Sequence, residues 1–535
     1  MSSYYLTTPI YYANDLPHIG HAYTTVVADA IARYQRSRGH DVFLLTGTDE
    51  HGVNIERIAA ANGGSATEHV DHVARVFGEL WRQLDVSYDR FIRTTEAAHQ
   101  RAVLALWQRL QSSGDLYRGT YSGAYCSKCE AYYQPDELVG DACRVHGVVC
   151  DVLSEENWFF RLSRYRHRLR DLYKGGEIEI VPQSRRNEVL AWIDQLEDFS
   201  ISRSARRARG WGIAVPGDPD QVIYVWFDAL GNYITGLGYG TDAALLARFW
   251  AGATSREHVI GKGITRFHAV YWPAMLLSAG LPVPTRILVH GYVTVEGRKI
   301  GKSAGNAIDP TALAEEFGTD ALRYYLLRHI RSTGDGDFLR ERLRQAYESE
   351  LAGQFGNLAH RVLSMIERYC DGVVPAPPEG FCEDNLLRTA AGLAETVAEH
   401  LRSFAFDRAL DAIWAFIAQA NRYVSEEEPW ALAKRAAASP GRQAGGAFTA
   451  RLHGCLFSLA VALDTIGRAI APLLPGASLR LARKLGRSGG YDWPEPASAL
   501  IGSTVGAGVP LFPTAAGTIP PFTSPGHRRH AVRLH

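Results

Sequence analysis

Two histidines three residues apart, in Pro17-His18-Ile19-Gly20-His21, are the first residues whose spacing suggests chemistry. They stand between a predicted strand and the start of a predicted helix, where free N–H groups and the helix dipole favour an anion. Gly20 lets a nucleotide approach the backbone closely. The pattern predicts a phosphate site in which two imidazoles donate hydrogen bonds as charge develops. Two surface histidines in a turn are the alternative reading.

A second motif, Lys299-Ile300-Gly301-Lys302-Ser303, is cationic and follows the strand predicted at residues 287–289. Two lysines three residues apart, beside a hydroxyl, suit the charge of a triphosphate. No Gly-x-x-x-x-Gly-Lys precedes them, so this is not a Walker loop. Taken alone, the segment also fits a solvated basic loop.

Four cysteines crowd into a short stretch of a chain with seven, which favours a metal site over disulfides. Cys126-x-x-Cys129 is followed by Cys143-x-x-His146, and two such pairs predict a tetrahedral Zn²⁺ knuckle. Because four protein ligands fill the coordination sphere, the predicted role is structural. Cys150 competes with His146 for the fourth position.

The elements that must position these residues begin with a strand at residues 4–8, a helix from about His21 to Gly39 and a buried strand at 42–45. Strand, helix, strand predicts a parallel sheet. Strand signals return at 222–226, 258–260 and 287–289, after the segment with the cysteines. The sheet is therefore predicted to be split by an insertion.

Helical periodicity dominates the chain from about residue 335, over 340–369, 384–405, 409–424 and 450–471. We therefore predict an α/β chain with a Rossmann-like catalytic domain split by a zinc-knuckle connective insertion, then an α-helical bundle and a short disordered tail. The predicted boundaries are 1–116 and 221–334 for the two catalytic halves, 117–220 for the insertion, 335–513 for the helical domain and 514–535 for the tail.

Composition excludes several classes of protein. With 46% hydrophobic residues the 535-residue chain is not disordered, and its 57 Lys+Arg against 57 Asp+Glu give no global field toward DNA or anionic lipid. We find neither an uninterrupted apolar run of about 18 residues nor a secretion signal at the start. A cytosolic protein without a membrane span is expected.

The histidine motif and the lysine motif, flanking a split sheet, resemble the signature pair of class I aminoacyl-tRNA synthetases. Longer segments are similar to methionyl-tRNA synthetases, and the likeness runs from about residue 4 to about 512. These segments are TTPIYYAND, LLTGTDEHG, YVWFDAL, FHAVYWPAMLL, VHGYVTVEGRKIGKS and NRYVSEEEPWALAK.

This resemblance implies a set of site residues. Those for ATP are His18, Gly20, His21, Gly261, Lys299, Lys302 and Ser303, with His18, His21, Lys299 and Lys302 catalytic. Those for methionine are Ile10, Tyr12, Asp49, Trp226, Ala229, Tyr233 and His268, with Asp49 pairing the α-ammonium. A soft thioether packs well against aromatic rings, although core packing alone would also explain each aromatic residue. In the helical domain, Asn357, Arg361 and Trp430 are implied to recognise the CAU anticodon; without the resemblance, a packed tryptophan and a solvated Asn/Arg pair would be the simpler reading.

The implied function is that of a methionine–tRNA ligase: ATP activates L-methionine to methionyl adenylate, which is transferred to tRNA(Met) for initiation and elongation. The implied cofactors are one structural Zn²⁺ and the Mg²⁺ that accompanies ATP. No DNA or membrane partner is expected. A monomer is expected, because the appended module that commonly makes dimers in this family is not found after the helical domain.

The chain departs from the family pattern at two glycines. Gly301 replaces the serine of Lys-Met-Ser-Lys-Ser, and Gly263 stands where the family has an acidic residue near the adenosine ribose. These changes raise the alternative of a variant paralogue with altered inhibitor sensitivity or with a non-catalytic tRNA-binding role. A synthetase for a branched aliphatic amino acid would need a large editing domain, and a cysteinyl enzyme would need its zinc in the active site.

Overall fold

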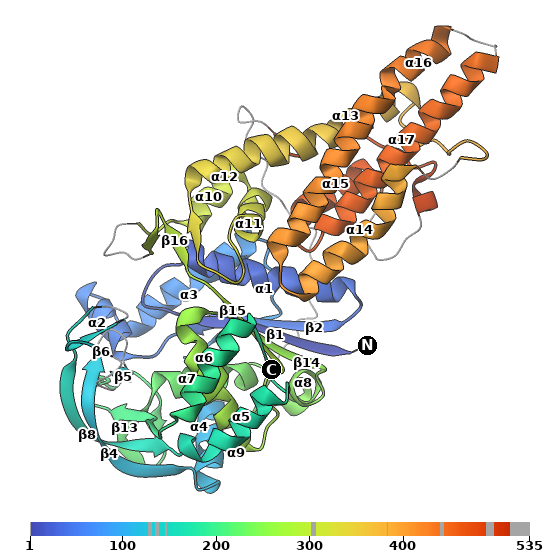
Figure 1. Ribbon diagram of the computed structural model, residues 1–535. Helices are drawn as coiled ribbons and strands as arrows, with labels where there is room; N and C mark the ends of the chain where they lie inside the picture. Colours follow the sequence, from blue (N-terminus) through green and yellow to red (C-terminus); the bar gives the residue numbers. More distant parts are fainter. Residues whose placement is uncertain are drawn as a thin grey trace. The chain divides into compact units, whose positions relative to one another are not determined.

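The computed structural model describes residues 2–126, 131–133, 138–144, 147–300, 306–381, 384–438, 443–487 and 497–513. The chain forms two compact units, of which the first comprises Met1–Thr311 and Arg331–Asp337 and the second Ala312–Ile330 and Phe338–His535 (Figure 1). The first contains a parallel sheet and the second is helical, which confirms the predicted α/β fold with a helical C-terminal region. The segment Ala312–Ile330, assigned above to the second catalytic half, clusters with the helical unit. The predicted tail lies outside the described residues.

The six-stranded sheet of the first unit has the order β3-β2-β1-β14-β15-β9, and every neighbouring pair is parallel. The strands are β1 (Ser3–Tyr12), β2 (Asp41–Asp49), β3 (Arg90–Arg93), β9 (Glu179–Val181), β14 (Ser255–Gly261) and β15 (Arg286–His290). The strands predicted at 4–8, 42–45, 258–260 and 287–289 are confirmed. From β1 the chain proceeds to β2 and β3 at one edge, and from β14 it proceeds to β15 in the opposite direction, beside the earlier strand β9 at the other edge. The strand order thus reverses between β1 and β14, where open parallel sheets bind ligands at their carboxyl ends.

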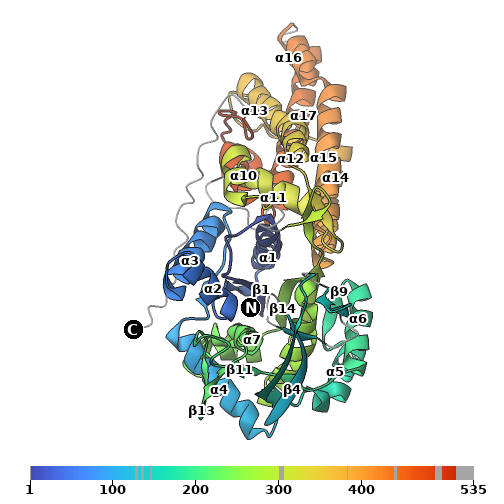
Figure 2. The same ribbon diagram turned by 90° about the vertical axis from the view of Figure 1, so that its left-hand side faces the viewer.

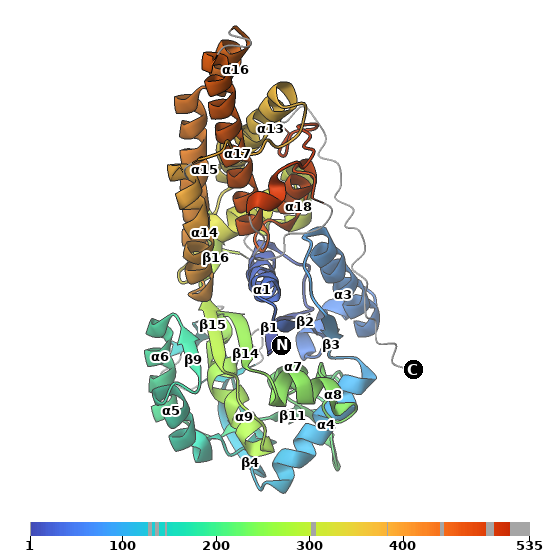
Figure 3. The ribbon, with the colours of Figure 1, turned by 90° about the vertical axis from the view of Figure 1, so that its right-hand side faces the viewer.

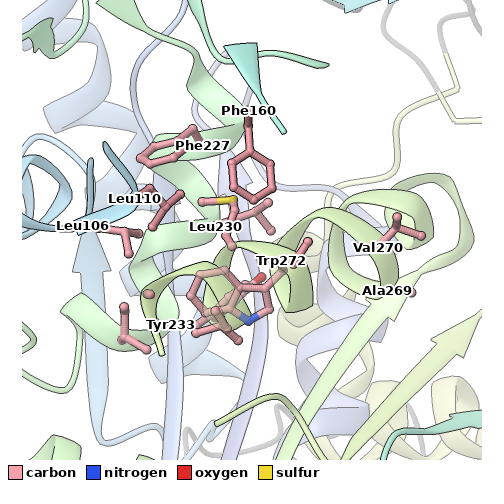
Figure 4. Packing of buried hydrophobic residues seen from close by; sticks show 14 of the residues in the cluster. Leu106, Leu110, Phe160, Phe227, Leu230, Tyr233, Ala269, Val270 and Trp272 are labelled. Carbon is pink, nitrogen blue, oxygen red and sulfur yellow. The ribbon is translucent and has the colours of Figure 1, made fainter. Parts of the chain in front are cut away.

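Helices cover both faces of this sheet. Figures 2 and 3 show α1 on one side of β1 and β14, and α7 on the other. The helices of the unit are α1 (Ile19–Ser37), α2 (Val53–Ala61), α3 (Ala66–Gln83), α4 (Ala97–Ser112), α5 (Arg166–Lys174), α6 (Gln183–Asp194), α7 (Val225–Thr235), α8 (Ala243–Leu246) and α9 (Trp272–Ala279). Beneath the sheet, Leu106 of α4, Phe227 and Leu230 of α7 and Trp272 of α9 share one buried core (Figure 4). This core holds α7 against its neighbours.

The insertion is built on a long antiparallel ribbon. Its strands are β4 (Leu116–Cys126), β5 (Ala131–Tyr133), β8 (Asp151–Phe160) and β10 (Phe199–Ser200), the hairpin β6 (Leu138–Val139) and β7 (Ala142–Cys143), and a second sheet of β11 (Ser202–Ser204), β12 (Ala214–Val215) and β13 (Asp218–Ile223). The prediction of a strand at 222–226 is wrong for the second half of that range. β13 ends at Ile223 and is no part of the parallel sheet, while Val225 begins α7. A short apolar run cannot by itself distinguish a buried strand from a buried helix.

The second unit is a bundle of helices (Figure 3). They are α10 (Pro310–Phe317), which begins just before the unit boundary, α11 (Thr319–Arg328), α12 (Arg340–Ala346), a π-helical segment (Tyr347–Gly356), α13 (Asn357–Tyr369), α14 (Asn385–Arg402), α15 (Phe406–Glu427), α16 (Pro429–Ala438), α17 (Gln443–Ile470) and α18 (Pro475–Lys484). The four helical periods predicted after residue 335 are confirmed. Among the described residues, α17 is the one helix long and apolar enough to cross a membrane. It packs against α14, α15, α16 and α18 with most of its middle buried, as a core helix does.

Candidate active site

The predicted phosphate site lies at the first turn of α1, where His18 caps the helix. The Gly20 N–H donates to His18 Nδ1 at 3.1 Å, and the His18 N–H donates to His21 Nδ1 at 3.2 Å. The two rings stack with centroids 3.8 Å apart. Because each Nδ1 atom accepts a hydrogen bond, the proton of each neutral imidazole is assigned to Nε2. Both histidines therefore carry an Nε2–H donor suited to a phosphate oxygen.

Burial keeps both imidazoles neutral near pH 7. Desolvation lowers the pKa of His18, and the Asp15 carboxylate only partly opposes that effect. Burial, reinforced by His18, holds the pKa of His21 well below its usual value. The rings of Tyr11 and Phe77 enclose His21, with centroids 4.9 and 5.4 Å away. The pair thus offers directed N–H donors at a helix N-terminus without adding positive charge.

The segment that carries the lysine motif returns to the same helix start. The Ile19 N–H donates to the Ile308 carbonyl at 3.2 Å. On the other flank, Ile300 Cδ1 lies 3.9 Å from the position that a Cβ atom on Gly20 would occupy. These two contacts bracket residues 301–305, which lie outside the described residues. Both described flanks of residues 301–305 therefore lie at the start of α1, beside the histidine motif.

The structure describes only the first two residues of the lysine motif, Lys299 and Ile300. Lys299 ends β17 (Arg298–Lys299), which forms an antiparallel hairpin with β16 (Val293–Val295). Lys302 and Ser303 lie outside the described residues.

A cavity of about 490 Å³ lies at the carboxyl ends of β1, β2 and β14. Its lining includes all seven residues predicted for methionine, namely Ile10, Tyr12, Asp49, Trp226, Ala229, Tyr233 and His268. Of the residues predicted for ATP, His21 and Gly261 line it as well. His18 and Gly20 are not among the lining residues and lie beside it at the start of α1.

Aromatic side chains in fixed orientations form one wall of the cavity. Trp226 stacks on Phe267 with ring centroids 3.7 Å apart and planes inclined by 6°. His268 Nδ1–H donates to the Ile264 carbonyl at 2.9 Å, so its Nε2 atom accepts from the Tyr233 hydroxyl at 2.6 Å. Burial lowers the pKa of His268 to about 4. The wall is therefore uncharged near pH 7 and suits an apolar side chain.

Asp49, the last residue of β2, is the one carboxylate among the described residues that line this cavity. An ammonium group in a largely apolar pocket needs such a partner. The cavity thus combines one anionic group with an uncharged aromatic wall, as a neutral amino acid requires.

Sequence reasoning missed several lining residues. Phe267 precedes the predicted His268 and completes the stack on Trp226. Thr24 lies one helical turn after His21, and its Oγ1 atom is 2.8 Å from His290 Nε2. The three-residue spacing from His21 was a signal that could have identified Thr24.

Gly263 lines the cavity beside Tyr292. A Cβ atom on Gly263 would lie 2.6 Å from the Tyr292 hydroxyl oxygen. Lys262 Nζ lies 4.5 Å from the centroid of the Tyr292 ring and donates to Asp335 at 2.7 Å. The phenol therefore occupies the space into which any side chain at position 263 would grow.

The predicted zinc site is described in part. Cys126 ends β4 and Cys143 ends β7, and both are buried. Burial and the neighbouring Cys126 and Cys143 raise the pKa of the Cys150 thiol, which thus lies close to both. Cys129 and His146 lie outside the described residues, and among those described no three side chains are arranged to hold a metal.

The predicted anticodon residues lie on two helices that pack together. Asn357 begins α13, and Arg361 follows one turn later. Trp430 is the second residue of α16, which contacts α13, and it is 41% exposed. An exposed indole of this kind can stack on an unpaired base.

Comparison with known proteins agrees with this geometry. A family model described as class I tRNA synthetases (M) matches residues 4–145 and 126–363. A methionine–tRNA ligase of Caldanaerobacter subterraneus subsp. tengcongensis is 43% identical over 90% of this chain and 74% of that protein. The one of Mycobacterium leprae is 42% identical over 91% and 90%. The methionyl-tRNA synthetase of Mycobacterium tuberculosis, solved in complex with methionyl-adenylate, superposes with a TM-score of 0.88 at 40% identity, covering 96% of this chain and 100% of that one.

Proposed function

We propose how this chain, which belongs to the methionyl-tRNA synthetase family, activates methionine with ATP and joins it to tRNA. The proposal rests on the way in which distant segments converge. At the carboxyl edge of one sheet lie the start of α1, both flanks of residues 301–305 and the seven lining residues predicted for methionine. This edge, next to the reversal of strand order, is where an open parallel sheet binds a nucleotide.

Methionine binds with its ammonium group against Asp49 and its side chain against the aromatic wall. The thioether is polarizable and packs well on Trp226 and Tyr233. Because Tyr233 and His268 satisfy one another, neither of these two groups favours a polar side chain. The pocket thus selects a neutral, extended side chain.

The phosphates of ATP bind at the first turn of α1. A carboxylate oxygen of methionine attacks the α-phosphorus, a new P–O bond forms, and the bond to the bridging oxygen of pyrophosphate breaks. The Nε2–H groups of His18 and His21 stabilise charge as it grows on the α-phosphate oxygens. Lys299 and Lys302 balance the charge of the departing pyrophosphate, to which the Mg²⁺ that enters with ATP also contributes.

Transfer follows at the activated carbonyl. The terminal 2′-hydroxyl of tRNA attacks the carbonyl carbon of methionyl adenylate, an ester bond forms, and AMP leaves. Asn357 and Arg361 contact anticodon bases through their side-chain donors, and Trp430 stacks on one of them. The helical unit therefore identifies the tRNA, while the α/β unit performs the chemistry.

A structural Zn²⁺ in the insertion is part of the proposal. Thiolates are ligands that zinc prefers, and the buried Cys126 and Cys143 are two candidate members of the donor set. Cys129 completes it with either His146 or Cys150 as the fourth ligand. The ion would tie the β6–β7 hairpin to the end of β4 and take no part in the reaction.

Methionine-dependent exchange of pyrophosphate into ATP tests the proposed activation step. Removing the Lys302 ammonium in Lys302→Ala leaves the leaving group's charge unbalanced, so the exchange rate should fall by about 100-fold or more. Arg298→Ala removes an exposed cation from the same hairpin and should change the rate less than about twofold. Exchange near the wild-type rate in Lys302→Ala would refute the role of that lysine. A wild-type chain without any exchange would support the non-catalytic alternative.

A further inference from the structure

A buried carboxylate that the proposed reaction does not use lies behind the methionine cavity. Asp228, in the first turn of α7, lies 2.6 Å from His51 Nδ1 and 2.7 Å from His99 Nε2. Asp228 and His99 are each 1% exposed, and His51 is 5% exposed. Burial raises the pKa of Asp228, but the two imidazoles outweigh that effect and bring it to about 2. Asp228 is therefore ionised at neutral pH, and both histidines donate to it.

His99, near the start of α4, contacts α7 a second time. Its Nδ1 atom lies 2.6 Å from Thr235 Oγ1, at the last residue of α7. In the neutral tautomer that donates Nε2–H to Asp228, this Nδ1 atom accepts from the Thr235 hydroxyl. Asp228 and Thr235 are two helical turns apart on one face. One imidazole thus holds both ends of the helix.

The same helix carries the wall of the methionine cavity. Trp226, Ala229 and Tyr233 line the cavity, while Phe227 and Leu230 pack in the core with α4 (Figure 4). The hydrophobic effect that drives this packing is non-directional, so it selects no particular orientation of polar groups. The short, charge-assisted hydrogen bonds of Asp228 add directed contacts to α7.

The other partner of Asp228 belongs to the loop that follows β2. His51 is two residues after Asp49, the carboxylate proposed to bind the ammonium group of methionine. This loop is held from its other side by Trp211, whose Nε1–H donates to the Glu50 carbonyl at 2.7 Å. The bond from His51 to Asp228 is therefore a direct link between the ammonium site and the helix that bears the aromatic wall.

We infer that Asp228 is a positioning residue for methionine: through His51 and His99 it fixes the separation between Asp49 and the wall formed by α7. The inference rests on the proposed function, since it assumes that methionine spans these two groups. The ATP end of the site, at α1, has no part in the network. Asp228 should therefore govern the affinity for methionine and leave that for ATP unchanged.

The test is the exchange assay, with KM determined separately for methionine and for ATP in Asp228→Ala. The KM for methionine should rise about tenfold or more, because a shift of about 1 Å in a positioned group can change a rate by on the order of 100-fold. The KM for ATP should stay within about twofold of wild type. Calorimetric titration with methionine alone should show the same loss of affinity.

Asp464→Ala is the matched control. Asp464 is 5% exposed and accepts from Arg468 at 2.8 Å and from Arg487 at 2.5 Å, within the helical unit. Its removal should lower the melting temperature without changing either KM. Equal rises of both KM values in Asp228→Ala, or none in a folded variant, would overturn the inference.

Thr235→Val provides a second variant if Asp228→Ala does not fold. It removes only the hydroxyl that holds the end of α7, and it should raise the KM for methionine several-fold with the KM for ATP unchanged. An unchanged KM for methionine would overturn the inference. Failure of the wild-type chain to exchange would instead contradict the proposed function, so the two failures are distinguishable.

Discussion

His18 uses its two ring nitrogens for different tasks. Its Nδ1 atom caps α1 by accepting from the Gly20 N–H, and its Nε2–H is the donor that we assign to ATP. A serine or an aspartate would cap the helix as well, but neither would leave a second directed donor on the same side chain. His21 follows the same rule, because its Nδ1 atom accepts from the His18 N–H. Helix capping and substrate binding thus depend on the same rings.

Because capping and substrate binding use the same rings, even the small substitution Gly20→Ala should reduce both stability and activity. A methyl group in Gly20→Ala would lie 2.9 Å from His18 Cε1 and 3.1 Å from Nδ1, so the ring must turn away. We expect a loss of about 1 kcal/mol of stability from the cap. Displacement of the Nε2–H donor should slow pyrophosphate exchange by roughly 10- to 100-fold.

Gly78→Ala is the control for Gly20→Ala. Gly78 lies within α3, and apart from adjacent residues and the backbone of the helix itself no atom lies within 4 Å of the position of its added methyl group. Exchange and stability should not fall in this variant. A wild-type exchange rate in Gly20→Ala would contradict the assigned role of the His18 ring.

Single residues also show where sequence reasoning ends. Asp49 and His268 were predicted because each belongs to a segment that resembles a known family. The network of Asp228 was not predicted, since His51 and His99 are 177 and 129 residues away from it along the chain. Hydrogen bonds between such distant residues leave no periodic pattern in the sequence.

Elements were predictable where burial imposes a pattern. β2 and β15 contain the short apolar runs 42–45 and 287–289, as strands covered on both faces do. The edge strand β9 has three residues and was missed, because so short a segment carries no pattern. The start of α7 was misread as a strand, since its apolar residues meet the core on one side and the cavity on the other. A helix buried in this way lacks the polar face that would reveal its period.

The β6–β7 hairpin permits a prediction about zinc. The Cys150 thiol lies near Cys126 and Cys143, and the Cys150 N–H donates to the carbonyl of Asp141, in the turn of the hairpin, at 2.9 Å. If His146 completes the site, His146→Ala should lose the metal while Cys150→Ala retains one Zn²⁺ per chain. If Cys150 completes it, the outcomes are reversed.

Native mass spectrometry after treatment with a chelator measures this zinc content. Cys370→Ala, in the helical unit, is the matched control and should retain the metal. A wild-type chain that never contains zinc would contradict the structural site altogether.

At the scale of the whole molecule, a substitution in one unit should impair the task of that unit and leave the task of the other unchanged. Trp430→Ala should lower kcat/KM for aminoacylation of tRNA by roughly 10- to 100-fold, because a stacked base contributes about 1–3 kcal/mol. Pyrophosphate exchange should be unchanged, since activation does not need the anticodon. The exposed Leu16→Ala, in the α/β unit, should leave tRNA affinity unchanged. Equal losses in exchange and aminoacylation in Trp430→Ala would contradict this division of tasks.

The order of strands in the sheet also affects how the chain folds while it is being synthesised. β2 pairs with one edge of β1 early in synthesis, but the other edge pairs only with β14, which begins at Ser255. An unpaired strand edge is a template for aggregation. At about 5–20 residues per second, that edge stays open for roughly 10–50 s of translation. We therefore expect the nascent N-terminal half to be prone to aggregation until β14 has emerged.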